Sequence, residues 1–256
     1  MLLYNMCLIL IAYRTHPKYK LVVAANRDEY YDRPTAPAGW WPKDHVVMAG
    51  KDLKSDGTWL GITRSGKWAA VTNFREMEKP REDAVSRGHL VKDYLVSDKG
   101  APIYMKDLRG RADDFNGFSL ILGDSERLWY FSNRENELRV LPAGVYGLGN
   151  ELLDSAWPNV KRGKAKFTQL VDHNLNLPID GLFQLLGDTE EAADDELPDT
   201  GMDKDVERAL SPIFVKTPEY GTRSSTVMLM DNAGTIYFEE RTVDPEGQNR
   251  FCFSQT

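Results

Sequence analysis

Cys7 is the residue whose type and position point most directly to covalent chemistry. It follows Met6 near the start of the chain, and the other cysteine is Cys252. A thiol attacks a carbonyl well only when a base takes its proton or its pKa is lowered. Removal of Met6 would give Cys7 a free α-amine, whose pKa of about 8 suits that base. The pattern therefore predicts an N-terminal nucleophile, and the structural alternative is a small apolar residue buried in a strand.

Charged residues after the next apolar run supply partners for this thiol. Residues 26–29 read Asn-Arg-Asp-Glu directly after an apolar stretch that we expect to pair with the Cys7 strand. A cation beside Cys7 favours the thiolate, and a carboxylate can orient the amine. Arg27 and Asp28 are candidates for these two roles, and Asn26 is a candidate substrate-binding residue. The structural alternative is a strand that ends in a charged turn.

Further polar candidates stand at the ends of later strands. Asn73 and Asn150 each end an apolar or glycine-rich run, and a side-chain amide there can donate to a developing oxyanion. Taken alone, such an asparagine is more often a turn residue. Arg223 precedes another apolar strand, and its structural alternative is a surface ion pair. Trp59 is a candidate for binding an apolar acyl group, as are three other tryptophans that more ordinarily would belong to the core: Trp40, Trp41 and Trp68.

The elements that must position these residues are strands at both ends of the chain and helices between them. Apolar alternation and turn residues predict paired strands across the turn at 14–18, a hairpin with its turn at Ser65-Gly66, and a hairpin across 232–234. Helices are expected at 86–99 and 156–174, and an acidic surface loop at 187–200. This order favours an α+β layered domain over alternating βαβ units.

Composition limits the classes of function. The 256 residues have 41% hydrophobic and 28% charged side chains, which is typical of a soluble globular domain with a sizeable core. A net charge of −7 argues against a nucleic-acid partner. The apolar run at 6–13 is too short to span a bilayer, and no secretory pattern precedes it, so free thiols and a cytoplasmic location are expected. No residue spacing predicts a metal site.

Several spaced motifs resemble one known family. They are the Met-Cys pair at 6–7, the Asn-Arg-Asp-Glu run at 26–29, and the segments 57–63, 69–74, 146–150 and 221–226. The sequence from Met6 onward resembles the NRDE family, also called the transport and Golgi organisation protein 2 family. That family is similar to the cholylglycine hydrolase and penicillin V acylase type of N-terminal nucleophile (Ntn) hydrolase.

The resemblance implies a single domain over residues 1–256 with a four-layer αββα sandwich of two antiparallel sheets. It implies that Cys7 is the nucleophile, that Asp28 contacts the free amine, and that Asn73 and Asn150 lie near the oxyanion and substrate. Arg223 matches the distal active-site arginine of the distant hydrolases, whereas Arg27 aligns only after a shift. Family members usually begin Met-Cys, so residues 1–5 are expected to be a misassigned extension.

Two functions follow from the resemblance. The first is an N-terminal-cysteine hydrolase or acyltransferase that acts without a cofactor on a small-molecule amide or thioester, through a thioacyl-enzyme. The alternative is a non-catalytic protein on the same fold that binds or carries haem or an acyl lipid. The sequence gives haem little support, because it contains no Cys-Pro pair of the kind that can bind haem.

Overall fold

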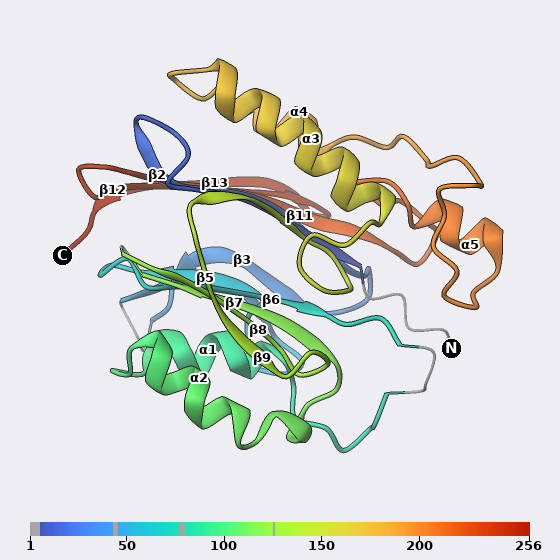
Figure 1. Ribbon diagram of the computed structural model, residues 1–256, viewed down its shortest axis with the longest axis horizontal. Coiled ribbons are helices and arrows are strands. Elements are labelled where there is room, and N and C mark those ends of the chain that lie inside the picture. Colours follow the sequence, from blue (N-terminus) through green and yellow to red (C-terminus); the bar gives the residue numbers. More distant parts are fainter. Residues whose placement is uncertain (1–5, 43–45, 77–79, 125) are drawn as a thin grey trace.

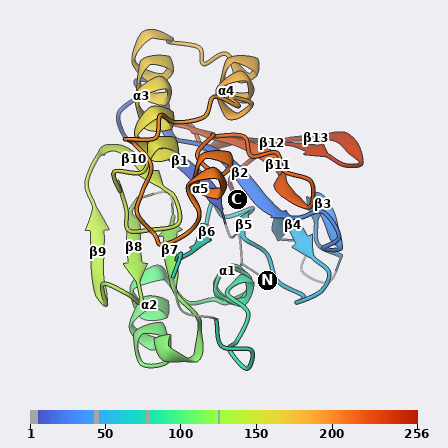
Figure 2. The same cartoon turned by 90° about the vertical axis from the view of Figure 1, so that its right-hand side faces the viewer.

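Two antiparallel sheets lie face to face, with helices on both outer faces (Figures 1 and 2). This computed structural model describes residues 6–42, 46–76, 80–124 and 126–256. The expected extension at 1–5 therefore lies outside the described residues. The predicted four-layer αββα architecture is confirmed.

The first sheet carries both ends of the described chain, and its strand order is β10-β1-β2-β11-β12-β13. Its middle strands are the long ones, so residues distant in sequence become neighbours across β2. In chain order the strands are β1 (Cys7–Tyr13), β2 (Tyr19–Tyr30), β10 (Gly144–Leu148), β11 (Tyr220–Asp231), β12 (Thr235–Val243) and β13 (Glu246–Ser254).

The second sheet is a meander in which each strand pairs with the next along the chain. Its hairpin across Ser65-Gly66 is confirmed, and Gly66 has the positive φ of 79° that favours glycine in a tight turn. The strands are β3 (Thr35–Trp40), β4 (Val47–Asp52), β5 (Leu60–Thr63), β6 (Trp68–Asn73), β7 (Phe118–Gly123), β8 (Leu128–Ser132) and β9 (Glu137–Leu141).

Helices α1 (Gly88–Val96) and α2 (Ala101–Arg109) pack on the second sheet, and α3 (Pro158–His173) and α4 (Ile179–Leu186) pack on the first. The predicted helices at 86–99 and 156–174 correspond to α1 and α3. The sequence patterns do not predict α2, α4, α5 (Lys204–Ala209) or the short 3₁₀ turn η1 (Ala112–Asp114). These elements have nine residues or fewer, and helices that short depend on tertiary packing.

Alternation along β1 divides its side chains between two cores. Leu8 and Leu10 pack with α3 and α4, whereas Ile9 and Ile11 pack with side chains of the second sheet. All four are at most 1% exposed. Cys7 shares the phase of Ile9, so the strand directs its side chain to the side that faces the second sheet.

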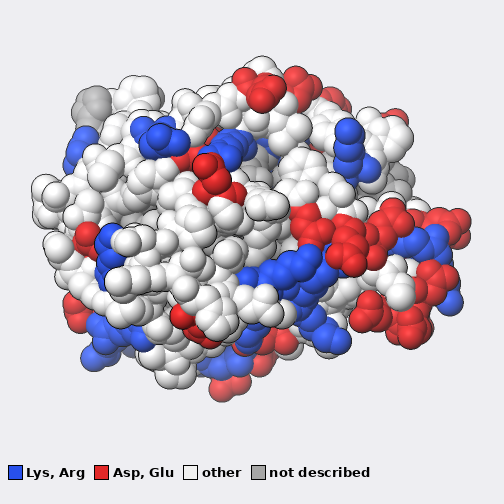
Figure 3. All heavy atoms as spheres, turned by 90° about the horizontal axis from the view of Figure 1, so that it is seen from above, with Lys and Arg blue, Asp and Glu red and all other residues white. Residues whose placement is uncertain are grey.

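The acidic loop predicted at 187–200 contains no regular helix or strand, as expected. Figure 3 shows acidic side chains gathered at the end of the molecule where Figure 1 places α5. The same view shows a basic band, and α3 carries such a run at 161–166. Cations of this run form ion pairs with Asp154 and Asp188. In the part of the chain that the structure describes, no helix is long and apolar enough to cross a membrane.

Both cysteines are free thiols. Cys252 lies on β13 opposite Tyr237 and is exposed, whereas the flanking Phe251 and Phe253 pack on the core between the sheets. Half-buried and exposed side chains thus alternate along this last strand, and no disulfide joins Cys252 to Cys7.

The close approach of β6 and β7 generates a stability prediction. A Cβ atom on Gly123 would overlap the indole of the buried Trp68, whereas a Cβ on Gly39 would meet open space. We expect Gly123→Ala to lower the free energy of unfolding by about 1–3 kcal/mol through overpacking, and Gly39→Ala to change it by less than about 0.5 kcal/mol. Denaturant unfolding of both variants measures this; equal effects would contradict the packing described here.

Candidate active site

A cavity of about 530 Å³ opens where the start of β1 meets the end of β2. Antiparallel pairing places the Cα of Cys7 opposite that of Arg27. Residues from both sheets and from the start of α1 line the cavity, among them Cys7, Arg27, Trp59, Asn73, Arg87 and Arg223. The pairing thus answers which residue of the 26–29 run stands opposite the thiol.

The backbone nitrogen of Cys7 is held firmly, whereas its thiol is in an unreactive state. The nitrogen donates to Oδ1 of Asn150 at 2.8 Å, and the sulfur lies 4.0 Å from the main-chain oxygen of Asp28. Cys7 is 7% exposed. Burial, reinforced by the charge of Asp28, raises the pKa of the Cys7 thiol to about 12. With Met6 attached, the group is therefore a protonated thiol at neutral pH.

The two asparagines have different positions. Asn150 is fully buried; its Oδ1 accepts from Cys7, and its Nδ2 donates to the main-chain oxygen of Asn73 at 2.8 Å. Its Oδ1 is committed to the Cys7 nitrogen and one of its two N–H donors to Asn73, so Asn150 holds the Cys7 nitrogen, and the oxyanion role expected from the sequence stays a prediction. Asn73 lines the cavity, and no described residue forms a hydrogen bond with its side-chain amide. Asn73 is thus the amide available to an oxyanion.

Asp28 is buried at 6% exposure, and its carboxylate accepts from the hydroxyl of Thr222 at 2.6 Å. Burial raises its pKa from 3.8 to about 7, against the opposing hydrogen bond from Thr222. The resemblance predicts a contact between Asp28 and the amine. In the Met6-linked chain the Cys7 nitrogen is a peptide nitrogen that donates to Asn150, while Asp28 contacts Thr222 and accepts from the thiol with its main-chain oxygen, so the contact with a free amine stays a prediction.

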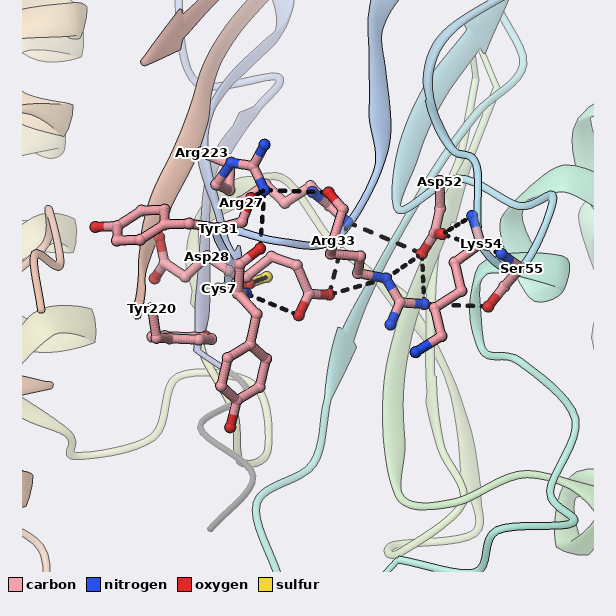
Figure 4. Close-up of polar contacts among 12 residues, drawn as sticks. Cys7, Arg27, Asp28, Tyr31, Arg33, Asp52, Lys54, Ser55, Tyr220 and Arg223 are labelled. Atoms are coloured by element: carbon pink, nitrogen blue, oxygen red, sulfur yellow. Dashed lines mark hydrogen bonds and ion pairs between the residues drawn. The ribbon is translucent and has the colours of Figure 1, made fainter. Parts of the chain in front are cut away.

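Arg27 belongs to a small network of alternating charges at the cavity wall (Figure 4). Its guanidinium lies 3.6 Å from Glu29 and 3.9 Å from Asp52. Arg33 lies between the same two carboxylates, 3.4 Å from Glu29 and 2.7 Å from Asp52. The carboxylates hold both cations at the cavity wall, and the charge of Arg27 favours the thiolate of Cys7. Arg33 and Asp52 were not predicted from the sequence, because they lie in a turn and a strand outside the family motifs described above.

A β-bulge brings Arg223 to the cavity rim. Thr222 pairs with Asp28 and Ser224 with Arg27, so Arg223 is the extra residue between them. Its Nη1 donates to the main-chain oxygens of Tyr30, Tyr31 and Arg33 at 2.8–3.2 Å (Figure 4). Arg223 therefore secures the chain that leaves β2, and both of its Nη atoms donate to main-chain oxygens, whereas its buried Nε has no hydrogen-bond partner among the described residues.

The structure does not support the substrate-binding role expected for Asn26. Because side chains alternate along β2, Asn26 points to the helix layer, is fully buried and donates to main-chain oxygens of Leu186 and Ile213 at 2.8 Å. Its Oδ1 accepts from Ser225. Asn26 thus ties α4 to the first sheet. Trp59 is half-buried and lines the cavity, and like Trp40 it packs at the margin of the core between the sheets. Trp41 and Trp68 are buried core residues that do not line the cavity.

Arg87, which precedes α1, is a cavity residue that sequence reasoning missed. It donates to the main-chain oxygen of Gly117 at 3.0 Å, and burial lowers its pKa to about 10. Among the described residues no carboxylate forms an ion pair with it. Its proximity to Cys7 and Glu29 places a cation across the cavity from β2. No periodic or motif signal marks it, because its role depends on how α1 packs on the second sheet.

The described residues contain no cluster of three or more His, Cys, Asp or Glu side chains with the geometry of a metal site. Among the residues that the structure describes, no histidine lines the cavity. The chemistry available here comes from the thiol, the nitrogen of Cys7, an uncommitted amide and several fixed charges.

Comparisons with known proteins agree in family and in fold. A model of the family described as Transport and Golgi organisation 2 matches residues 6–245. The chain is 36% identical to the cow (Bos taurus) Transport and Golgi organization protein 2 homolog over 258 residues, covering 93% of each chain.

Two solved structures show the fold at low sequence identity. Penicillin V acylase from Agrobacterium tumefaciens has a TM-score of 0.53 and 14% identity, covering 97% of this chain and 86% of that one. A variant of the conjugated bile acid hydrolase from Clostridium perfringens has a TM-score of 0.50 and 9% identity, covering 98% of each chain. Both are Ntn hydrolases, so the Ntn-hydrolase-like fold expected from the resemblance is confirmed.

The buried carboxyl of Asp28 predicts how stability depends on pH. Because its pKa is about 7 in the folded protein and 3.8 in a free side chain, the folded state keeps a proton that the unfolded state has released between these values. Its contribution to stability is therefore complete below about pH 4 and falls as the pH rises to 7. The difference in unfolding free energy, wild type minus Asp28→Asn, should decrease by at most about 4 kcal/mol over this range.

Urea unfolding of both proteins at several pH values between 4 and 8 measures this difference, with the 256-residue chain used for each. A difference that stays level, or that increases with pH, would show that Asp28 is ionised throughout. Asn at this position keeps an acceptor for the Thr222 hydroxyl, so the comparison isolates the charge.

Proposed function

The chain belongs to the Transport and Golgi organisation 2 family, and on that premise we propose that it is an N-terminal-cysteine hydrolase or acyltransferase acting on an amide or thioester. The shared Ntn-hydrolase fold supports an acyl-transfer reaction, although fold alone does not assign one. Cys7 is the proposed nucleophile, and its own α-amine, freed by removal of Met6, is the proposed base.

One observation carries the proposal: Asn150 holds the Cys7 nitrogen at 2.8 Å, beside the cavity that Cys7 and Asn73 both line. A general base must lie within reach of the proton that it takes. Here the nucleophile and the base belong to the same residue, so the covalent bonds of Cys7 keep the thiol and the amine close together. Asn150 orients the nitrogen, and Asn73 supplies an amide for the oxyanion.

The reaction follows from these positions. The Cys7 sulfur attacks the substrate carbonyl carbon while the amine takes the thiol proton, and the negative charge moves to the carbonyl oxygen, which accepts from Asn73. The intermediate collapses to a thioester, and the ammonium returns the proton to the departing amine or thiol. Water, activated by the same amine, then cleaves the thioester and releases a carboxylic acid; in a transferase another nucleophile takes the place of water.

Residues around the thiol explain why removal of Met6 matters. In the peptide-linked state the Cys7 nitrogen is an amide without an available lone pair, and burial raises the thiol pKa to about 12. A positive ammonium on the same residue would favour the thiolate, as Arg27 already does. The chain start thus controls whether Cys7 is a nucleophile.

The second candidate function is a non-catalytic carrier of haem or an acyl lipid. The buried, protonated thiol of the Met6-linked chain favours it, because a carrier needs no reactive Cys7. Histidine ligation within the cavity has no support from the described lining residues. Haem would have to use another ligand, so an acyl ligand fits the carrier hypothesis better than haem.

The decisive experiment compares protein that begins at Cys7 with the full chain that keeps residues 1–6, both verified by intact mass. We expect the Cys7-starting form to hydrolyse acyl amides or thioesters and to react with iodoacetamide at least about tenfold faster at pH 8, because its thiol pKa is lower. Cys7→Ser in the same form should lose most turnover while its melting temperature changes little.

Equal turnover by the two forms would refute the α-amine as base. Absence of turnover on both substrate classes, together with stoichiometric binding of an acyl ligand or haem, would establish the carrier in place of the enzyme. Cys252→Ser is the matched control for the labelling, since Cys252 is exposed on the last strand.

Asn73 provides a test of the oxyanion site. We expect Asn73→Ala to lower kcat about a hundredfold to a thousandfold with a smaller change in KM, because the lost donor acts mainly in the transition state. Steady-state kinetics of the Cys7-starting protein measures this, with the exposed Asn176→Ala as control. A change confined to KM would instead assign Asn73 to substrate binding.

A further inference from the structure

Met6 occupies a pocket of its own beside Cys7, separate from the charged cavity. It is only 2% exposed, and it packs with the buried side chains of Leu210, Val215 and Tyr220. Tyr30 and Trp157 also pack against this cluster. We call this pocket the Met6 pocket. It is formed by the segment around α5 and the start of β11, whereas Met6 itself precedes β1.

The Met6 pocket also contacts the main-chain amide groups of its occupant. The hydroxyl of Tyr220 donates to the carbonyl oxygen of Met6 at 3.1 Å and accepts from its N–H at 2.5 Å. Tyr220 is 1% exposed, and its ring packs edge-on against Tyr30. The pocket therefore recognises a carbonyl group at its mouth and an apolar chain in its interior.

A buried cation closes the far end of the Met6 pocket. The guanidinium of Arg75 contacts the thioether sulfur of Met6 at 2.5 Å and is paired with Glu207 at 2.7 Å. It also stacks on Trp157, with 4.6 Å from the guanidinium carbon to the ring centre. The side chain of Arg75 is 6% exposed and that of Glu207 is 3% exposed. Because both are buried, we expect them to stay in place when Met6 is removed. The pocket should therefore persist in a chain that begins at Cys7.

Covalent geometry relates this pocket to the reaction. The carbonyl carbon of Met6 is bonded to the Cys7 nitrogen, so only the Cα and Cβ atoms of Cys7 separate that nitrogen from the sulfur, and the mouth of the Met6 pocket adjoins the thiol. Once Met6 is removed, a substrate acyl group can place its carbonyl at the same mouth and its chain in the same interior. The departing part of the substrate then extends toward the charged cavity that holds Arg27 and Arg87.

We propose that the pocket vacated by Met6 is the acyl-chain site of the mature protein, and that it selects a linear acyl group about as long as methionine. This inference rests on the proposed removal of Met6 and the proposed hydrolase function. A hexanoyl chain matches methionine from carbonyl carbon to terminal methyl, and methylthiobutanoyl also places a sulfur at Arg75. Longer or branched chains meet Leu210, Val215 and the Arg75–Glu207 pair.

The first test is a chain-length series on protein that begins at Cys7, with acyl amides and thioesters from acetyl to dodecanoyl. We expect kcat/KM to rise about fourfold for each methylene up to hexanoyl, the value for burial of one methylene. It should fall beyond that length, and methylthiobutanoyl should be at least as good as hexanoyl. Val215→Phe should move the optimum to shorter chains, and Leu210→Ala should move it to longer ones.

Val140→Phe, an equal change on the exposed face of β9, is the control and should leave the optimum unchanged. Thermal unfolding shows whether each variant folds. The two pocket variants are expected to shift the optimal chain length in opposite directions. A loss of stability in one variant cannot produce that pair of shifts. A flat chain-length profile, or an optimum that neither variant moves, would overturn the assignment.

The second test measures binding without turnover. 2-Heptanone, which carries the hexanoyl group without a bond that can be hydrolysed, is titrated into protein with labelled leucine and valine methyl groups, and the NMR signals of Leu210 and Val215 are followed. We expect shifts in the form that begins at Cys7 and none in the form that keeps Met6, whose side chain fills the pocket. Absence of shifts in the first form would overturn the pocket even if the protein is a hydrolase. Shifts without turnover would uphold the pocket and refute the hydrolase.

Discussion

The antiparallel pairing of β2 with both β1 and β11 is the constraint on which the site depends. One neighbour sets Cys7 opposite Arg27, and the other sets Thr222 opposite Asp28. A slip of one residue along β2 would turn the inward side chains outward, because side chains alternate between the two faces. The buried residues on both faces of β1 and β2 prevent such a slip, so the apolar cores of the fold also hold the catalytic candidates in register.

Electrostatics divides the neighbourhood of Cys7 into two regions. On one side the cavity holds cations and carboxylates that neutralise one another, as Arg33 does between Glu29 and Asp52. On the other side Met6 lies in an apolar pocket bounded by a buried ion pair. A substrate that spans both regions would need an apolar acyl part and a polar departing part. Such an amphipathic requirement follows from burial and charge, without reference to any relative.

Under the proposed function, the residue at which the chain begins would act as a chemical switch. An amide at Cys7 gives a buried, protonated thiol, whereas an ammonium on the same atom would add a positive charge next to the sulfur. The protein scaffold barely needs to move for this change, because Asn150 already holds the nitrogen. The same folded scaffold is thus compatible with an inert binding protein and with an enzyme, and under the proposal the N-terminal chemistry decides between them.

The sequence by itself determined the layered α+β class, the hairpins and the family, because alternation, turn residues and spaced motifs are local patterns. It also marked Cys7, Asp28, Asn73, Asn150 and Arg223 as site residues, and all of these except Asn150 line the one cavity. Only the tertiary structure decided that Asn26 ties α4 to the sheet and that Asn150 holds the Cys7 nitrogen, since these roles depend on which face of a strand meets which layer. The positions of Arg87 and the Met6 pocket were likewise invisible in the sequence, because their walls come from segments up to about 200 residues apart that meet only when the sheets pack.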